Sequence, residues 1–120
     1  MKILILEDNL ERQKQFIMNL VDHNICITDS SKTAIGKLTN EKWDILMLDH
    51  DLGGQVHVKS GENTGFEVAK FLENNKQYMP TNVIVHTLNP VGAQNIMSCL
   101  PFALRIPFVW IKTHLTKLGL

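Results

Sequence analysis

Short apolar runs recur along this chain at regular intervals. Such a run is typical of a strand that is covered on both faces, because a half-exposed strand would alternate polar and apolar residues. Four runs have this character: Ile3 to Leu6, Ile25 to Ile27, Ile45 to Leu48 and Val83 to Val85. A fifth strand is expected from Arg105 to Val109.

The segments between these strands carry helical patterns. Apolar residues recur near helical spacing from Leu10 to Val21 and from Ser31 to Leu38. A last helix is expected from Ile111 to Leu118, with Gly119 ending it. Helices therefore alternate with strands along most of the chain.

Two further helices have recognisable first turns. Thr64 is expected to be an N-cap, and Glu67 stands at the third helical position of a capping box. Asn89 is expected to cap a helix that runs to about Leu100, because Pro90 at the first helical position needs no N–H partner.

Strands that alternate with helices predict a parallel sheet with right-handed crossovers. The 120 residues hold five such units. We therefore expect one domain, residues 1–120, of the α/β class, with a doubly wound five-stranded parallel sheet of flavodoxin-like type and strand order 2-1-3-4-5. The connection from Gly53 to Asn63 is about twice the usual loop length and suits a mobile cover over a site.

Composition narrows the choice of partners. Twelve basic and twelve acidic residues give a formal net charge of zero, so no overall field favours nucleic acid or an anionic membrane. We therefore expect no extended nucleic-acid surface. No apolar run approaches the roughly 20 residues that cross a bilayer, so we expect no membrane contact.

The two cysteines bear on the compartment. Cys26 and Cys99 lack C-x-x-C spacing and lie in apolar surroundings, and no apolar leader with a basic head precedes them. This pattern is typical of reduced, packed thiols. It favours a cytoplasmic protein.

Acidic residues end the first and third predicted strands. In a sheet of this order the ligand crevice lies at the carboxyl ends of those two strands. Glu7 and Asp8 follow one strand and Asp49 and Asp51 follow the other. Neighbouring strands lie about 4.8 Å apart, so we expect these carboxylates to converge, with Asp51 contributing its carboxylate or its backbone carbonyl.

Converging carboxylates repel one another unless a cation joins them. Hard oxygen ligands of this kind suit Mg²⁺ or Mn²⁺, and the predicted metal ligands are therefore Glu7, Asp8, Asp49 and Asp51. The alternative is that the first pair caps a helix and the second pair forms an Asx-type turn.

Two histidines accompany these acids. His86 ends the fourth predicted strand and is expected to stand beside His50. Imidazole exchanges protons near neutral pH, with an unperturbed pKa of about 6.5. His50 and His86, with Asp49 and Asp51, are therefore the predicted catalytic residues, acting as general acid and general base. The alternative is that each histidine is a hydrogen-bonded core residue.

An anion is expected close to these groups. Thr87 and Asn89, at the start of the fourth helix, are predicted to bind phosphate oxygens, because free N–H groups lie there. Arg12 lies a turn into the first helix, where it either meets the anion or forms a solvated surface. His57, in the long loop, either closes over the site or stays in solvent. No Ser, Cys or Lys shows the spacing of a nucleophile with its base.

These residues resemble the response-regulator receiver domain. Glu7-Asp8 resembles its acidic pair, Asp49 its phospho-accepting aspartate and Thr87 its switch hydroxyl. Receivers also carry a lysine followed by proline at the end of the fifth strand, for which this chain offers only Arg105 or Lys112. Position 7 is Glu where receivers commonly have Asp.

Three segments resemble a variant of that family, the cyclic-phosphate processing receiver domain. They are Leu48-Asp49-His50-Asp51-Leu52-Gly53, Thr64-Gly65-Phe66-Glu67-Val68 and Val85-His86-Thr87-Leu88-Asn89-Pro90-Val91-Gly92, within a resemblance that spans Lys2 to Leu100. It implies a receiver fold and metal-dependent, phosphoesterase-type processing of a cyclic phosphate on a nucleotide or an RNA end. The alternatives are a regulatory phospho-accepting receiver and a non-catalytic module that binds a cyclic nucleotide. We expect a monomer or a homodimer.

Overall fold

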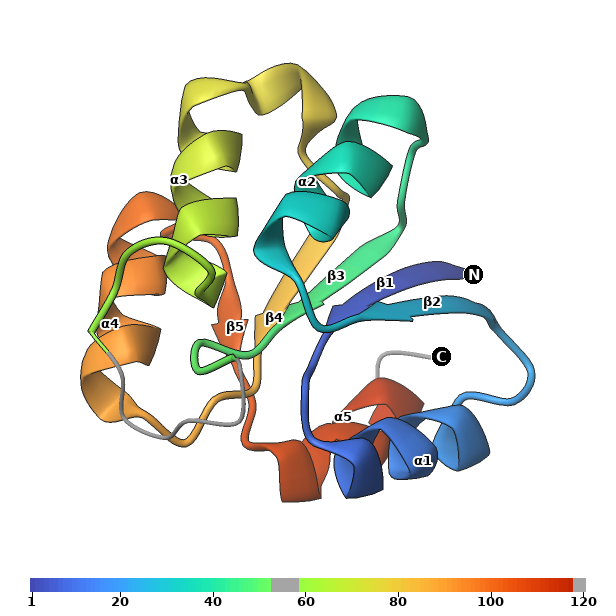
Figure 1. The fold of residues 1–120 in the computed structure, drawn as a ribbon. Helices are drawn as coiled ribbons and strands as arrows, with labels where there is room; N and C mark the ends of the chain where they lie inside the picture. The colour runs from blue at the N-terminus through green and yellow to red at the C-terminus, as the bar shows by residue number, and fades with distance from the viewer. Residues whose placement is uncertain (53–58, 118–120) are drawn as a thin grey trace.

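A five-stranded parallel sheet forms the centre of the structure (Figure 1). The structure is a computed structural model, and it describes residues 1–52 and 59–117. The strands are β1 (Lys2–Leu6), β2 (Asn24–Thr28), β3 (Ile45–Leu48), β4 (Asn82–Val85) and β5 (Leu104–Arg105), in the order β2-β1-β3-β4-β5. This confirms the predicted parallel sheet and its strand order.

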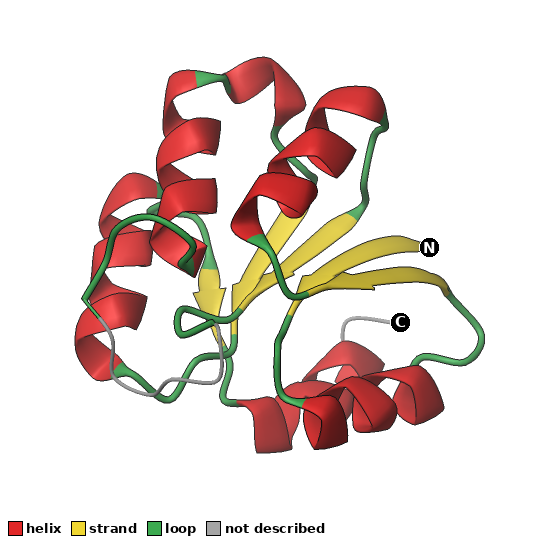
Figure 2. Ribbon diagram, viewed as in Figure 1, coloured by secondary structure: helices red, strands yellow, loops and turns green. Residues whose placement is uncertain are grey.

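Helices cover both faces of the sheet, as Figure 2 shows. They are α1 (Leu10–Asn19), α2 (Ser31–Asn40), α3 (Gly65–Asn74), α4 (Pro90–Cys99) and α5 (Ile111–Lys117), with short 3₁₀ turns η1 (Lys76–Tyr78) and η2 (Phe108–Trp110). The pair α1 and α5 lies on one face, and α2, α3 and α4 lie on the other. Among the described residues, no helix has the length and apolar character that crossing a membrane requires.

Successive residues of the strands point to opposite faces, and this divides the core in two. Leu46 and Leu48 of β3 belong to the cluster that packs with α2, α3 and α4. Ile45 and Met47 belong to the cluster that packs with α1 and α5. The other inner strands divide in the same way, as the two-residue repeat of a strand requires.

The fifth strand is shorter than predicted. It covers Leu104–Arg105 rather than Arg105 to Val109. Pro107 has no N–H to donate to a neighbouring strand, and the chain turns there into η2. The Phe108 ring packs edge-on against Phe16 of α1, with 5.2 Å between centroids. The aromatic residue that looked like part of a strand therefore belongs to the helical layer.

The two predicted N-caps differ in their outcome. Asn89 caps α4 as predicted, because its Oδ1 accepts the Gly92 N–H at 3.0 Å. Thr64 stands at the N-cap of α3, but the capping box was wrong: its hydroxyl donates to the Gly61 carbonyl at 2.8 Å. The Glu67 carboxylate instead accepts the Asn63 N–H at 3.1 Å and the Ser31 hydroxyl.

Candidate functional site

Three buried polar side chains meet where β1, β3 and β4 end. Glu7, Asp49 and His86 each follow the last residue of their strand, and by strand alternation they share the face of α1 and α5. One ligand atom from each side chain lies within 4.8 Å of the others. Glu7 and His86 are fully buried and Asp49 is 5% exposed. We call these three residues the acid–histidine group.

Glu7 is the best-paired member of this group. Its Oε1 lies 3.1 Å from His86 Nε2 and 3.8 Å from Arg12 Nη1, and its Oε2 accepts the Asn9 N–H at 3.1 Å. Burial alone would raise the pKa of Glu7. The hydrogen bond and charge of His86, with the smaller effects of Asn9 and Arg12, outweigh burial and hold that pKa below its ordinary value.

Asp49 behaves in the opposite way. Burial, together with the charge of the Glu7 carboxylate, raises the pKa of Asp49 to about 6, although His86 and the His50 N–H act against the rise. The His50 N–H donates to Asp49 Oδ1 at 2.8 Å. Two buried carboxylates that repel one another form a place where a cation would be stabilised.

The donor set of the acid–histidine group fits a divalent metal ion. Carboxylates suit Mg²⁺ and Mn²⁺, whereas imidazole suits softer ions than Mg²⁺. The His86 ring packs edge-on against Phe16, with 5.3 Å between centroids, and its buried Nδ1 has no hydrogen-bond partner among the described residues. Two oxygens and one nitrogen therefore favour Mn²⁺ over Mg²⁺.

His50 belongs to a second group of hydrogen bonds. Its Nδ1 lies 2.8 Å from Asp51 Oδ1 and its Nε2 lies 2.8 Å from the Ser60 hydroxyl oxygen. The Asn89 amide donates to Asp51 Oδ1 at 3.0 Å, and the Asn95 amide donates to Ser60 Oγ at 2.8 Å. We call these five residues the His50 network.

The prediction that His50 and His86 stand side by side was wrong. His86 contacts Glu7 and Phe16 on the α1 side, whereas His50 contacts Gly92 of α4. Asp49 and His50 are consecutive, so an extended chain turns their side chains to opposite faces. Counting in steps of two from Leu48 would have separated the histidines from sequence alone.

Comparison with known families identifies the domain. The sequence model of the family described as "Cyclic-phosphate processing Receiver domain" matches residues 2–101. The chain belongs to this family. No curated protein matches it.

Solved structures with the same fold are response-regulator receivers. Chemotaxis protein CheY4 of Vibrio cholerae has a TM-score of 0.72 at 18% identity, over 97% of this chain and 96% of that one. TrrA of Thermotoga maritima, solved with Mg²⁺ and BeF, has a TM-score of 0.70 at 18% identity, over 98% and 97%. The Mn²⁺-bound regulator Rcp1 has a TM-score of 0.69 at 18% identity, over 88% and 79%. These likenesses establish the fold of this receiver domain.

Only some of the remaining predicted site residues lie in or next to one of the two groups. Arg12 lies beside Glu7, and Asp8 is half-buried and stands outside the acid–histidine group. Asp51 contributes its carboxylate to the His50 network and does not belong to the acid–histidine group. His57 lies outside the described residues.

Thr87 does not join Asp49. The register pairs Leu48 with Val85, so His86 follows beside Asp49. The buried Thr87 hydroxyl accepts the Asn89 N–H at 3.1 Å in the turn before α4. In this receiver domain a histidine therefore holds the place next to Asp49 where the resemblance suggested a hydroxyl.

The end of β5 offers no cation to the acid–histidine group. Val85 pairs with Arg105, and the Ile106 N–H donates to the Val85 carbonyl at 2.9 Å. Ile106 thus follows beside His86, directly before Pro107, and is 5% exposed. Arg105 and Lys112 are exposed. A buried isoleucine precedes the proline where receivers carry lysine.

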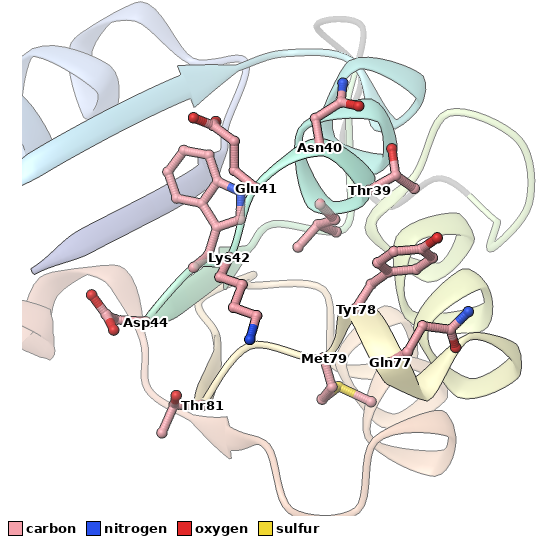
Figure 3. Close-up of a pocket in the computed structure, with 11 residues that line it drawn as sticks. Thr39, Asn40, Glu41, Lys42, Asp44, Gln77, Tyr78, Met79 and Thr81 are labelled. Atoms are coloured by element: carbon pink, nitrogen blue, oxygen red, sulfur yellow. The ribbon is translucent and has the colours of Figure 1, made fainter.

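A surface pocket lies near the amino ends of β3 and β4, away from the strand ends that carry the acid–histidine group (Figure 3). It is lined by the end of α2, by the residues just before β3 and β4, and by Tyr78 and Met79. None of the predicted site residues lines it. The candidate chemistry is therefore at the carboxyl ends of the strands.

Proposed function

We propose that this receiver domain is a metal-dependent phosphoesterase that opens a cyclic phosphate on a nucleotide or an RNA end. The observation that carries the proposal is the acid–histidine group, a buried donor set at the ends of three strands. A second histidine, His50, follows Asp49 in the chain, and its ring is oriented by Asp51. Membership of the cyclic-phosphate processing family supports the same substrate class.

Each part of the site has a chemical role in this proposal. Glu7, Asp49 and His86 hold the cation, which when bound supplies positive charge toward the phosphoryl oxygens. Arg12, next to Glu7, offers a guanidinium to the anionic substrate. His50 exchanges protons while Asp51 fixes the orientation of its ring.

The place of Ile106 favours this function over phosphoryl signalling. A phosphorylated Asp49 would add charge to a buried site, and the end of β5 offers it an isoleucine instead of a lysine. The acid–histidine group contains instead an imidazole that signalling does not require. Both departures point toward processing of a substrate.

The test is a screen of cyclic phosphates, including 2′,3′-cyclic nucleotides, with Mn²⁺ and with Mg²⁺. We expect the wild-type protein to open the ring. The rate should fall by roughly 100-fold or more in His50→Gln and in His86→Gln, which is the usual cost of losing general acid–base catalysis or a ligand. His23→Gln, at a half-buried histidine that contacts the N-terminus, is the matched control.

Two outcomes would count against the proposal. Full activity in both variants would remove the histidines from the mechanism. Tight binding of a cyclic nucleotide that is recovered unchanged after long incubation would instead establish a binding module.

A further inference from the structure

The His50 network contains a carboxylate, an imidazole and a hydroxyl in one line of hydrogen bonds. Asp51 Oδ1 lies 2.8 Å from His50 Nδ1, and His50 Nε2 lies 2.8 Å from Ser60 Oγ. An ionised Asp51 carboxylate could only accept this hydrogen bond, and the tautomer of His50 that matches it carries the proton on Nδ1 and turns the lone pair of Nε2 toward the serine hydroxyl. This is the order of groups that activates a serine nucleophile.

The imidazole in this line is held firmly. His50 is fully buried. A Cβ atom on Gly92 would lie 2.4 Å from the ring Cγ, so only glycine lets α4 approach the ring this closely. The Asn89 amide donates to Asp51 Oδ1 at 3.0 Å and fixes the carboxylate in turn.

Ser60 has the surroundings of a reactive hydroxyl. The residue is half-buried, so it lies at the border of the protein interior. The Asn95 amide donates to Ser60 Oγ at 2.8 Å and would stabilise negative charge as it develops on that oxygen. The Ser60 oxygen therefore has two neighbours, His50 Nε2 as a candidate proton acceptor and the Asn95 amide as a hydrogen-bond donor.

We propose that Ser60 is a nucleophile that forms a covalent phosphoryl adduct, an inference that rests on the proposed function for its substrate. Ser60 Oγ bonds to phosphorus and one ester P–O bond of the cyclic phosphate breaks. The serine proton passes to His50 Nε2 and then to the departing ester oxygen. Water next attacks phosphorus and gives a proton to His50 Nε2, the Ser60 Oγ–P bond breaks, and His50 passes that proton to the serine oxygen.

The first experiment uses a fluorophosphonate, which reacts without the cyclic substrate. Ser60 Oγ would bond to phosphorus as fluoride leaves, and peptide mass spectrometry would find the adduct on Ser60. We expect no adduct in Ser60→Ala and labelling slowed by roughly 100-fold or more in His50→Gln. Ser98→Ala, at an exposed helix serine bonded to the Gln94 carbonyl, should label at the wild-type rate.

A second experiment separates this inference from the proposed function. If cyclic phosphates are opened and Ser60→Ala retains the wild-type rate, the proposed phosphoesterase function is supported, but the proposal that Ser60 is the nucleophile is wrong. If Ser60 is labelled but no cyclic phosphate is opened, the proposal that Ser60 is a nucleophile is supported, and the proposal that its substrate is a cyclic phosphate is wrong. Absence of fluorophosphonate labelling in folded wild-type protein, with melting temperature as the check, also overturns the nucleophile.

Discussion

Asp49 carries a charge that the metal-free protein accommodates poorly. Its carboxylate is buried next to Glu7, and its pKa rises to about 6 from an ordinary value of 3.8. In the unfolded chain the group ionises near that ordinary value. The contribution of Asp49 to the free energy of unfolding of the wild type therefore falls as pH rises from about 4 through 6. The reason is that Asp49 releases its proton at a lower pH in the unfolded chain than in the folded protein.

Asp49→Asn should remove this cost. At pH 7.5 with chelator, we expect the free energy of unfolding to rise by about 2 kcal/mol, because a neutral amide replaces a buried charge and its oxygen still accepts the His50 N–H. Denaturant unfolding at pH 4 and at pH 7.5 measures the difference, which should vanish at the lower pH.

Comparing variant with wild type at each pH isolates Asp49 from Glu7, whose lowered pKa acts in the opposite direction. Asp22→Asn, at an exposed aspartate, is the control and should change stability by less than about 0.5 kcal/mol. A gain of equal size at both pH values would contradict the assignment of this cost to ionisation.

Individual site residues were predictable to different degrees. Glu7 and Asp49 follow apolar runs, so strand order alone brought them together. Ser60 follows the segment 53–58 in a connection without periodicity, and only the fold places its hydroxyl at His50. The separation of His50 from His86 was present in the two-residue repeat of the strand.

At the scale of elements, glycines set how closely helices approach the ends of the strands. A Cβ on Gly92 would overlap the His50 ring, whereas a Cβ on Gly36 of α2 would meet nothing within 4 Å. The two positions therefore form a matched pair: both are helical glycines, but only one touches a functional side chain.

Gly92→Ala is expected to push the His50 ring away from Ser60. We expect a loss of about 1–3 kcal/mol in the free energy of unfolding, the usual cost of overpacking, together with loss of fluorophosphonate labelling at Ser60. Gly36→Ala should stabilise the protein by up to about 1 kcal/mol, because alanine is the better helix former. Both are measured by denaturant unfolding, and unchanged labelling in Gly92→Ala would show that the ring position does not matter.

Most elements followed from local pattern, and the exceptions have physical causes. The three inner strands β1, β3 and β4 were recognisable because burial on both faces leaves only apolar residues. The fifth strand was overestimated because Phe108 and Val109 are apolar for other reasons: Phe108 packs on Phe16, and Val109 is 76% exposed. The capping box failed because Ser31, distant in sequence, contacts Glu67.

At the scale of the molecule, a metal ion would couple the ends of three strands. Glu7, Asp49 and His86 come from β1, β3 and β4, so an ion held between them binds the folded chain and not the unfolded one. Ligand binding of this kind stabilises by mass action, about 2.7 kcal/mol at a concentration one hundred times the dissociation constant.

Mn²⁺ should therefore raise the melting temperature more than Mg²⁺ at equal concentration, because one of the three ligands is an imidazole nitrogen. The effect should weaken below pH 6, where Asp49 becomes protonated and ceases to be a ligand. Differential scanning fluorimetry at pH 7.5 and pH 5 measures both. Glu7→Gln should reduce the shift, whereas Glu41→Gln, at an exposed surface ion pair, should not. Equal shifts in wild type and Glu7→Gln would place the ion elsewhere.

The first residue of α3 has a consequence for how the two halves of the site can move. The Gly65 N–H donates to the His50 carbonyl at 3.0 Å, and its Cα stands so near the Asp49 carbonyl that a Cβ would lie 1.9 Å away. The peptide units on both sides of His50 are thus held on the side of α3. A backbone rotation that moved the Asp49 carboxylate toward a cation would also move the His50 ring relative to Ser60. Binding of a cation and alignment of the serine hydroxyl would therefore be coupled through the same backbone segment.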